Sequence, residues 1–330
     1  MNYKNYYIWD PTPTDKVAKH LLKWRPETVN FFCAEEYEKG FEWRSEKGFE
    51  TIEEVSRHKT VNMIFGSFNC KFYKNNNNIP ENANLFFWPT YWCTRSFIEL
   101  QNNNCFGFFA NDNPAVLFQS LNTQPHYHRC LMMDILASQD LVNKGAISWH
   151  IFPDDYNWQH WIPKKLILDK AYHKQLDAYK SMPETFRTSF MSLVTESTFE
   201  VPFITEKTWT NIFLGRPFLM YGHQYLHKHL KSLGFLEYDE IFDYSFEKQR
   251  NLEKRGILLV ENIKRLQKEN LKSLKEKIQE KLDYNQNLAF RIAKDINLIP
   301  EPYRNHLDLV DRGDRKADGP DKIVYEHYYM

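Results

Sequence analysis

The chain of 330 residues lacks several features that mark well-known classes of protein. No apolar run approaches the roughly 20 residues of a membrane-spanning helix. The N-terminal residues MNYKNYYIWD lack the apolar segment of a secretory signal, so we expect a cytoplasmic protein. Charge of neither sign is in excess, with 43 Lys and Arg against 43 Asp and Glu. This balance disfavours a broad nucleic-acid-binding surface but is compatible with a local basic patch.

The chain also has little that indicates a metal site or a disulfide framework. Its five cysteines show no CxxC spacing, which favours buried thiols in a reducing compartment. The H-x-H pairs at 126–128 and 227–229 have no third ligand at a suitable spacing, so capping or solvent-facing histidines are expected. Asp154 and Asp155 form a lone acidic pair, which is weak evidence for a metal. We therefore assign no metal ligands and no cofactor.

Short apolar runs alternate with helical patterns along the chain. This alternation predicts an α/β fold with a mainly parallel sheet, and the length suffices for two domains. We place a first domain at residues 1–112, a second at 113–300 and an extended tail at 301–330. The expected strands of the first domain are Tyr6–Trp9, Thr28–Cys33, Val61–Phe65 and Leu85–Trp88.

The second domain is expected to begin with a strand at Ala115–Leu121. A helix with Leu131 and Ile135 on its apolar stripe follows, and then a strand at Ala146–His150. Residues 260–298 carry one long amphipathic pattern. We expect two helices there, with a bend near Asp283–Asn285, which pack back on the first domain.

The most informative stretch is residues 191–222, which predicts strand, loop, helix and strand. Met191–Val194 and Arg216–Tyr221 are apolar runs of strand length. Between them, Thr205 can cap the start of a helix and Gly215 can close its end. The residues expected to face the core from this helix are Trp209, Ile212 and Phe213.

Glu206 and Lys207 fall in the first turn of that predicted helix. Unpaired backbone N–H groups and the helix dipole favour an anion there, and a lysine adds a positive charge suited to phosphate. A neighbouring carboxylate suits ribose hydroxyls. The alternative is an ordinary surface helix with a solvated ion pair, which is the commoner arrangement on residue types alone.

The segments TES, FITEK and GRPFLMYG, in this order, resemble the donor-binding segment of α1,3-type fucosyltransferases and of related exostosin-like and viral glycosyltransferases. The similarity extends over Asn122–Phe246. It implies two Rossmann-like domains facing across a cleft, the GT-B arrangement, with a GDP- or UDP-linked sugar bound to the second domain. The residues TES stand where the fucosyltransferases tend to have Glu-Asn-Ser, which leaves the donor sugar open.

The resemblance also implies roles for individual residues. Phe203 would lie near the base or ribose, and Thr205 would belong to the same donor-binding turn. Glu206 would bind the ribose and Lys207 the pyrophosphate. Glu196 matches a loop glutamate that faces the donor sugar.

A second part of the resemblance is the run NTQPHYHR, from Asn122 to Arg129. Arg129 stands at an expected strand-to-helix turn, where a guanidinium can hold two phosphate oxygens. The resemblance implies that Arg129 binds the pyrophosphate and that Asn122 belongs to the same donor site. The alternative is that Arg129 pairs with a nearby carboxylate such as Asp134.

The reaction implied is transfer of a sugar from a nucleotide sugar to the hydroxyl of a glycan or other acceptor. Cationic side chains would neutralise the leaving diphosphate, so a metal ion is not required. An inverting mechanism needs a base in the first domain, and Asp10, after the first strand, is the candidate. Glu35, Glu36 and Asp112 compete with it, and a simple turn aspartate is the alternative.

Two other classes of function stay open. One is a viral glycosyltransferase that modifies nucleic-acid bases, which would need a basic groove and an extruded base. The other is a non-enzymatic Rossmann protein that binds a nucleotide or a partner.

Aromatic residues, at 16%, suit carbohydrate-facing surfaces as well as packed cores. Trp158 and Trp161 could therefore stack on a sugar or base, although such residues more often pack inside.

Overall fold

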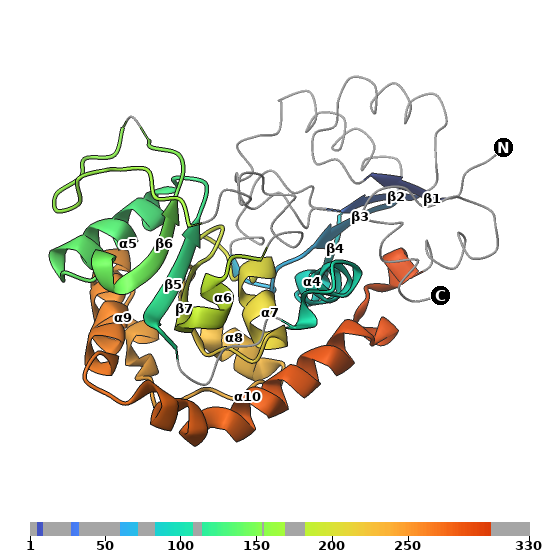
Figure 1. Ribbon diagram of the computed structural model, residues 1–330. Coiled ribbons are helices and arrows are strands. Elements are labelled where there is room, and N and C mark those ends of the chain that lie inside the picture. Colours follow the sequence, from blue (N-terminus) through green and yellow to red (C-terminus); the bar gives the residue numbers. More distant parts are fainter. Residues whose placement is uncertain are drawn as a thin grey trace. The chain divides into compact units, whose positions relative to one another are not determined.

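The computed structural model describes residues 5–8, 28–32, 60–71, 83–107, 114–153, 155–168 and 182–304 (Figure 1). Five acidic residues discussed above lie outside these ranges: Asp10, Glu35, Glu36, Asp112 and Asp154. The chain divides into two compact units. The first takes Met1–Arg95, Glu200–Phe203 and Lys294–Met330, and the second takes Ser96–Phe199 and Ile204–Ala293. The division falls inside helix α4 (Tyr91–Asn102), ahead of the boundary that we placed at residue 112.

In its described residues the first unit has one parallel sheet in the order β1–β2–β3–β4. Its strands are β1 (Asn5–Ile8), β2 (Thr28–Phe32), β3 (Thr60–Phe65) and β4 (Asn84–Phe87), each within one residue of the predicted bounds. A side-chain ladder crosses three of them. The amide of Asn62 donates to Asn30 at 2.8 Å, and that of Asn84 donates to Asn62 at 3.0 Å. Because the three asparagines are partners in register, the ladder favours this register over a slipped one.

The core of the first unit includes residues from the far end of the chain. Ile64, Trp88 and Tyr91 pack with Ile299 and Tyr303, and the rings of Trp88 and Tyr303 lie 5.4 Å apart. Residues 301–304 form a helical turn, in which the N–H of Tyr303 donates to the carbonyl of Pro300 at 2.9 Å. The tail that we expected to be extended from residue 301 therefore begins with a packed turn, and residues 305–330 lie outside the described part.

The described residues of the second unit form a parallel sheet in the order β6–β5–β7–β8. The coarse prediction of an α/β fold with parallel sheets is thereby confirmed, as are the strands expected in this unit. One cross-strand pair, Phe118 and Gly145, places a large ring opposite a glycine. The strands are β5 (Val116–Asn122), β6 (Gly145–Trp149), β7 (Ser189–Thr195) and β8 (Phe218–Tyr221).

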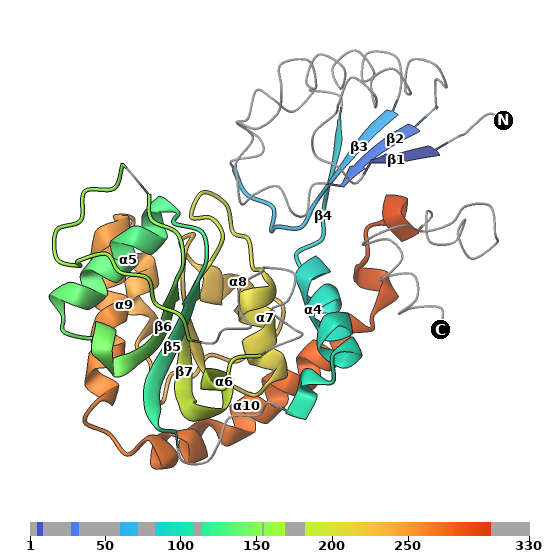
Figure 2. The same cartoon turned by 45° about the horizontal axis from the view of Figure 1, so that its top comes forward.

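Helices cover both faces of this second sheet (Figure 2). Helix α5 follows β5 and leads to β6, whereas α7 follows β7 and leads to β8 in the opposite direction across the sheet. Right-handed crossovers then place α5 and α7 on opposite faces, where α5 packs with α9 and α7 packs with α10. β5 and β7 are therefore neighbours whose chains leave in opposite directions, which makes their carboxyl ends a topological switch point. The helices are α5 (Tyr127–Ser138), α6 (Thr185–Thr188), α7 (Glu206–Phe213), α8 (Leu226–Ser232), α9 (Leu252–Leu266) and α10 (Leu271–Ala293).

The two long C-terminal helices separate at residues 267–270, and the bend expected at Asp283–Asn285 is wrong. Asn270 starts α10, because its side-chain oxygen accepts the N–H of Ser273 at 3.0 Å. Asn285 lies inside α10 and faces inward. Its side chain accepts from the N–H of Leu236 at 2.8 Å and donates to the carbonyl of Leu236 at 2.9 Å. The polar residues near 285 thus serve packing and do not end the helix.

Candidate functional site

The switch point is held together by hydrogen bonds between the ends of two strands. The Thr195 hydroxyl donates to the side-chain oxygen of Asn122 at 2.5 Å, which joins the last residue of β7 to the last residue of β5. The Asn122 amide donates to Ser120 at 3.1 Å, and its backbone N–H donates to Ser148 at 2.9 Å. Asn122 is buried. Asn122, which we expected at the donor site, thus uses its side chain to join the ends of β5 and β7.

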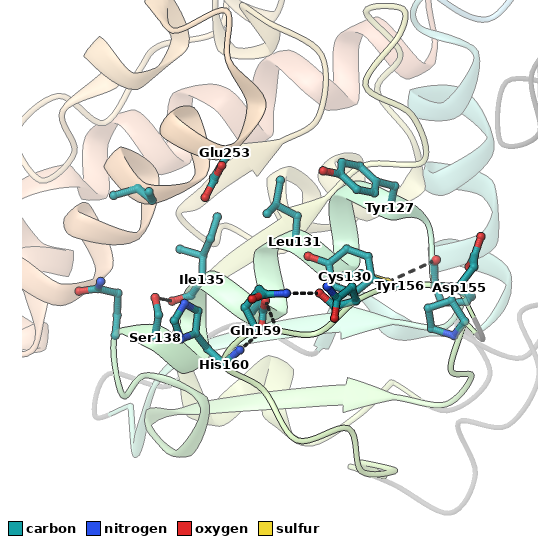
Figure 3. Close-up of a pocket in the computed structure, with 16 residues that line it drawn as sticks. Tyr127, Cys130, Leu131, Ile135, Ser138, Asp155, Tyr156, Gln159, His160 and Glu253 are labelled. Atoms are coloured by element: carbon teal, nitrogen blue, oxygen red, sulfur yellow. Dashed lines mark hydrogen bonds between the residues drawn. The ribbon is translucent and has the colours of Figure 1, made fainter.

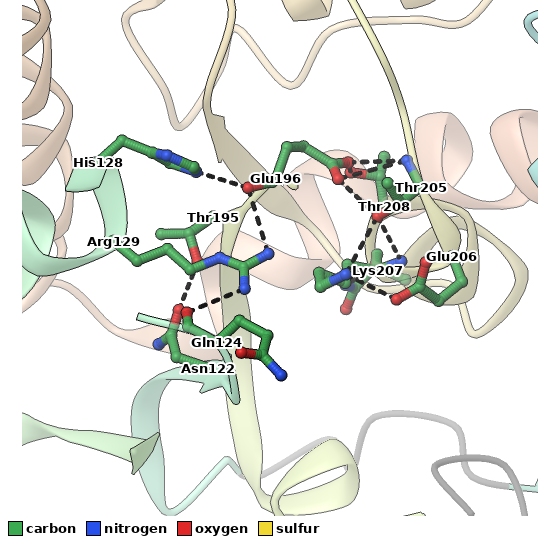
Figure 4. Close-up of polar contacts among 11 residues, drawn as sticks. Asn122, Gln124, His128, Arg129, Thr195, Glu196, Thr205, Glu206, Lys207 and Thr208 are labelled. Carbon is green, nitrogen blue, oxygen red and sulfur yellow. Dashed lines mark hydrogen bonds and ion pairs between the residues drawn. The ribbon is translucent and has the colours of Figure 1, made fainter. Parts of the chain in front are cut away.

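Glu196, the next residue after β7, places its carboxylate against the start of α7 (Figure 4). The hydroxyls of Thr205 and Thr208 each donate to it at 2.6 Å, and the backbone N–H of Thr205 donates at 3.2 Å. Burial raises the pKa of Glu196, while the positive charge of Lys207 and the two threonine hydroxyls oppose that rise. The Glu196 side chain is fully buried, and its hydrogen bonds hold the N-cap and the first turn of α7.

Helix α7 begins and ends where the sequence predicts. Thr205 is its N-cap and accepts the N–H of Lys207 at 3.4 Å, and Gly215 follows its end with a φ of 60°. The predicted core stripe of Trp209, Ile212 and Phe213 is buried. The local signals of cap, stripe and closing glycine were therefore sufficient to define this element.

Glu206 and Lys207 form an ion pair in the first turn of α7. The Lys207 ammonium nitrogen lies 2.7 Å from the Glu206 carboxylate, and the side chains are 22% and 21% exposed. More than three quarters of each side chain is thus covered. This differs from the freely solvated pair that the sequence left open, and it places both charged groups beside the backbone N–H groups of a helix start.

Arg129 lies in the first turn of α5 and is buried. Its guanidinium donates to the main-chain oxygens of Gln124 at 3.1 Å and Glu196 at 3.4 Å. Both of these acceptors are main-chain carbonyls, and they hold the guanidinium in place at the end of β7. The alternative partner, Asp134, is used elsewhere: its carboxylate accepts backbone N–H groups at 2.7–2.8 Å from Gln159, His160 and Trp161.

His128 belongs to the same cluster, although it was not predicted to be a site residue. Its Nε2 donates to the main-chain oxygen of Glu196 at 2.6 Å. Burial, together with the charge of Arg129, lowers the pKa of His128 to about 3, so the ring is neutral. The expectation of capping or solvent-facing histidines is wrong here, and it is also wrong at His227, which is buried against Glu247. The one available signal was the position of His128 beside Arg129 in the run HYHR.

The positive charges of Lys207 and Arg129 lie near the same residues, although α7 and α5 cover opposite faces of the sheet. The charge of Lys207 acts on both the Glu196 carboxylate and the His128 ring, and the charge of Arg129 acts on the same ring. Figure 4 shows both side chains gathered around Glu196 at the end of β7. An anion at the switch point would therefore meet two positive charges and two helix N-termini.

Two further residues, Phe203 and Asp10, were expected at the donor or acceptor site. Phe203 is buried and belongs to the first unit, so its place relative to Lys207 stays a prediction. Asp10, the candidate base, lies outside the described residues. Thr195 and Thr208, which the sequence did not single out, contribute hydroxyls that fix Asn122 and Glu196.

No family model, curated protein or solved structure matches the chain significantly. Within the described ranges, no group of three His, Cys, Asp or Glu side chains could hold a metal ion. In the same part of the chain, no helix is long and apolar enough to cross a membrane.

A second feature of this unit is a pocket beside α5, here called the α5 pocket (Figure 3). Its volume is about 650 Å³, and its walls come from α5, the loop at 153–160 and the start of α9. Arg129, Glu196, Glu206 and Lys207 are not among the residues that line it. The charged cluster and the α5 pocket are thus separate features, and only the cluster supplies cations suited to a diphosphate.

Proposed function

We propose that this chain is a glycosyltransferase that moves a sugar from a nucleotide-sugar donor to the hydroxyl of a glycan or other acceptor. The observation that supports it is the gathering of Arg129 and Lys207 at the switch point between β5 and β7. Ligands of open α/β sheets bind outside the carboxyl ends of the strands at such a point. Two helix N-termini, a guanidinium and an ammonium group together suit a diphosphate.

In the proposed reaction, Arg129 and Lys207 neutralise the negative charge that develops on the leaving nucleoside diphosphate. Glu206 accepts hydrogen bonds from the ribose hydroxyls. Its ion pair with Lys207 keeps both side chains at the start of α7 before the donor binds. Glu196 and His128 are positioning residues, because they fix the first turns of α7 and α5 that carry the charged groups.

The proposal includes the two-domain GT-B arrangement that the sequence resemblance implies. A parallel sheet in each unit supports it. In this arrangement the second unit binds the nucleotide sugar and the first binds the acceptor. A first-unit carboxylate, with Asp10 as the candidate, removes the proton from the acceptor hydroxyl in an inverting reaction.

A thermal-shift series with UDP, GDP and their sugar conjugates tests this proposal. A ligand that binds only the folded protein raises its melting temperature. We expect such a rise with at least one nucleoside diphosphate, and none with uridine or guanosine, which lack phosphates. No rise with any of the diphosphates would contradict the proposal.

The enzyme activity needs a separate measurement. NMR of the sugar anomeric protons would follow hydrolysis or transfer of each nucleotide sugar that binds. We expect slow release of the free sugar even without an acceptor. Binding without any hydrolysis or transfer would instead indicate a nucleotide-binding protein that is not an enzyme.

A further inference from the structure

The α5 pocket is rich in groups that suit polyhydroxylated ligands. Tyr127 and Tyr156 line it with their rings 5.8 Å apart. Asn157 and Gln159 add side-chain amides, and Glu253 adds a carboxylate from α9. Its volume of about 650 Å³ is typical of small-molecule sites, which span roughly 300–1,000 Å³.

The aromatic side of the pocket has an open face and a rigid support. Tyr127 is 60% exposed, although it begins a helix whose other early residues are buried. Behind it, Tyr156 packs on Trp158 with ring centres 4.5 Å apart, and Trp158 packs on Trp161 at 4.9 Å. The two tryptophans that the sequence left as possible stacking residues are therefore supports, and the tyrosines present the surface. An exposed ring on such a support is suited to stack on the apolar face of a pyranose.

The polar wall is also fixed in place. Asp134, which lies on α5, accepts three backbone N–H groups from residues 159–161. These bonds hold the loop with Asn157 and Gln159 against the helix. The wall thus presents preformed donors and acceptors, which lowers the ordering cost of binding.

The charges of the lining argue against anions and against a compact cation. The residues that line the pocket include Asp134, Asp155 and Glu253 but neither lysine nor arginine. A phosphate, sulfate or sialic acid would therefore meet like charge. Figure 3 shows Glu253 projecting from α9 and Asp155 from the loop on the other side, so these carboxylates do not converge on one point. The carboxylate of Asp134 is already occupied by backbone N–H groups. Dispersed acceptors of this kind match several separate hydroxyl groups.

The geometry points to a second ligand site in the α5 pocket, which binds a neutral saccharide with one sugar ring on Tyr127 and its hydroxyls on Asn157, Gln159 and Glu253. This site is distinct from the charged cluster at the switch point. Saccharide binding in the α5 pocket does not depend on whether a nucleotide binds at the charged cluster.

Saturation-transfer difference NMR on the full chain tests this inference, with lactose, maltose and N,N′-diacetylchitobiose as probes. We expect saturation of the ring protons of at least one of them. Tyr127→Ala should raise the Kd of that saccharide about tenfold, the upper end for loss of an aromatic stacking contact. Tyr127→Phe keeps the ring and should retain binding. The matched control is Tyr284→Ala, which removes a tyrosine that is 44% exposed on α10 and does not line the pocket.

Any of three outcomes would overturn the inference. The first is the absence of saturation transfer to all three saccharides, and the second is saturation transfer that Tyr127→Ala leaves unchanged. The third is binding of spermidine in place of the saccharides, which would assign the pocket to organic cations. Lys207→Ala separates this site from the proposed nucleotide site, because saccharide binding should persist in that variant.

Discussion

The main-chain oxygen of Glu196 accepts a hydrogen bond of 2.6 Å from Nε2 of His128. This bond joins the residue after β7 to the first turn of α5, 68 positions earlier in the chain. A carbonyl oxygen can only accept, so the proton must lie on Nε2. Arg129, the next residue, donates to the same oxygen. The proposed anion site is therefore anchored on a neutral histidine.

We expect the stability contributed by His128 to depend on pH. Its pKa falls from 6.5 to about 3 on folding, because burial disfavours the charged ring. As the pH falls, the His128 ring is thus protonated in the unfolded chain before it is protonated in the folded protein. The contribution of His128 is fully present above pH 6.5 and is lost as the pH decreases toward 3.

His128→Gln tests this dependence, because glutamine keeps an N–H donor and does not titrate. Urea unfolding of both proteins between neutral pH and about pH 4 gives the difference in unfolding free energy. We expect the excess unfolding free energy of the parent protein over His128→Gln to decrease steadily as the pH is lowered over this range. His223, whose pKa is also lowered by burial, is present in both proteins and cancels. Two parallel stability curves would contradict the buried, neutral His128.

Glu196→Ala should destabilise the second unit. The change leaves the N–H of Thr205 and the hydroxyl of Thr208 without their buried acceptor. The cost should be about 1–3 kcal/mol in the free energy of unfolding. Glu196→Gln should cost less, because it keeps one acceptor oxygen and removes a carboxylate whose pKa burial has raised. Chemical denaturation measures both variants.

A matched control for these variants is Glu261→Ala, on the exposed side of α9. It should change the unfolding free energy by less than about 0.5 kcal/mol, as is usual for surface substitutions. If Glu196→Ala were equally mild, the carboxylate would not hold the start of α7.

Gly145→Ala should destabilise the sheet through its contact with Phe118. A Cβ atom at residue 145 would clash with three atoms of the Phe118 ring, which is itself fully buried. Overpacking of this kind costs about 1–3 kcal/mol. The double variant Gly145→Ala/Phe118→Leu should recover part of the lost stability. Lys144→Ala, an exposed neighbour, is the control. Full stability of Gly145→Ala would show that the ring can move aside.

The elements that the sequence predicted best are those with local causes. Helix α7 is set by Thr205 at its start, Gly215 after its end and an apolar stripe between them, all within eleven residues of each other. The strands of both sheets follow from short apolar runs in the same way. Glu206 and Lys207 could be placed in the first turn because that turn was itself predictable.

What the sequence could not give depends on partners that are distant along the chain. The inward position of Asn285 depends on Leu236, 49 residues away, so the polar run near 285 predicts a bend that the structure does not have. The sequence predicts a capping or solvent-facing role for His128, because its hydrogen-bond partner, Glu196, follows β7, the second strand after α5. Glu196 could be linked to a donor sugar by resemblance, but its contact with Thr208 requires the fold of the loop between them.

The central claim is that Lys207 and Arg129 bind the diphosphate of a nucleotide, and calorimetric titration of UDP and GDP into the parent protein and Lys207→Ala tests it most directly. Hydrogen bonds to charged groups contribute about 1.5–3 kcal/mol, so we expect the variant to bind about ten- to hundredfold more weakly. Glu206→Ala should weaken the binding of the nucleotides and leave the binding of inorganic pyrophosphate unchanged, since it removes only the proposed ribose contact. Neither change should unfold the protein, because both side chains lie outside the buried Trp209 stripe. Unchanged nucleotide affinity in Lys207→Ala, with the protein folded, would contradict the claim and leave α7 as a capped helix with an ordinary ion pair.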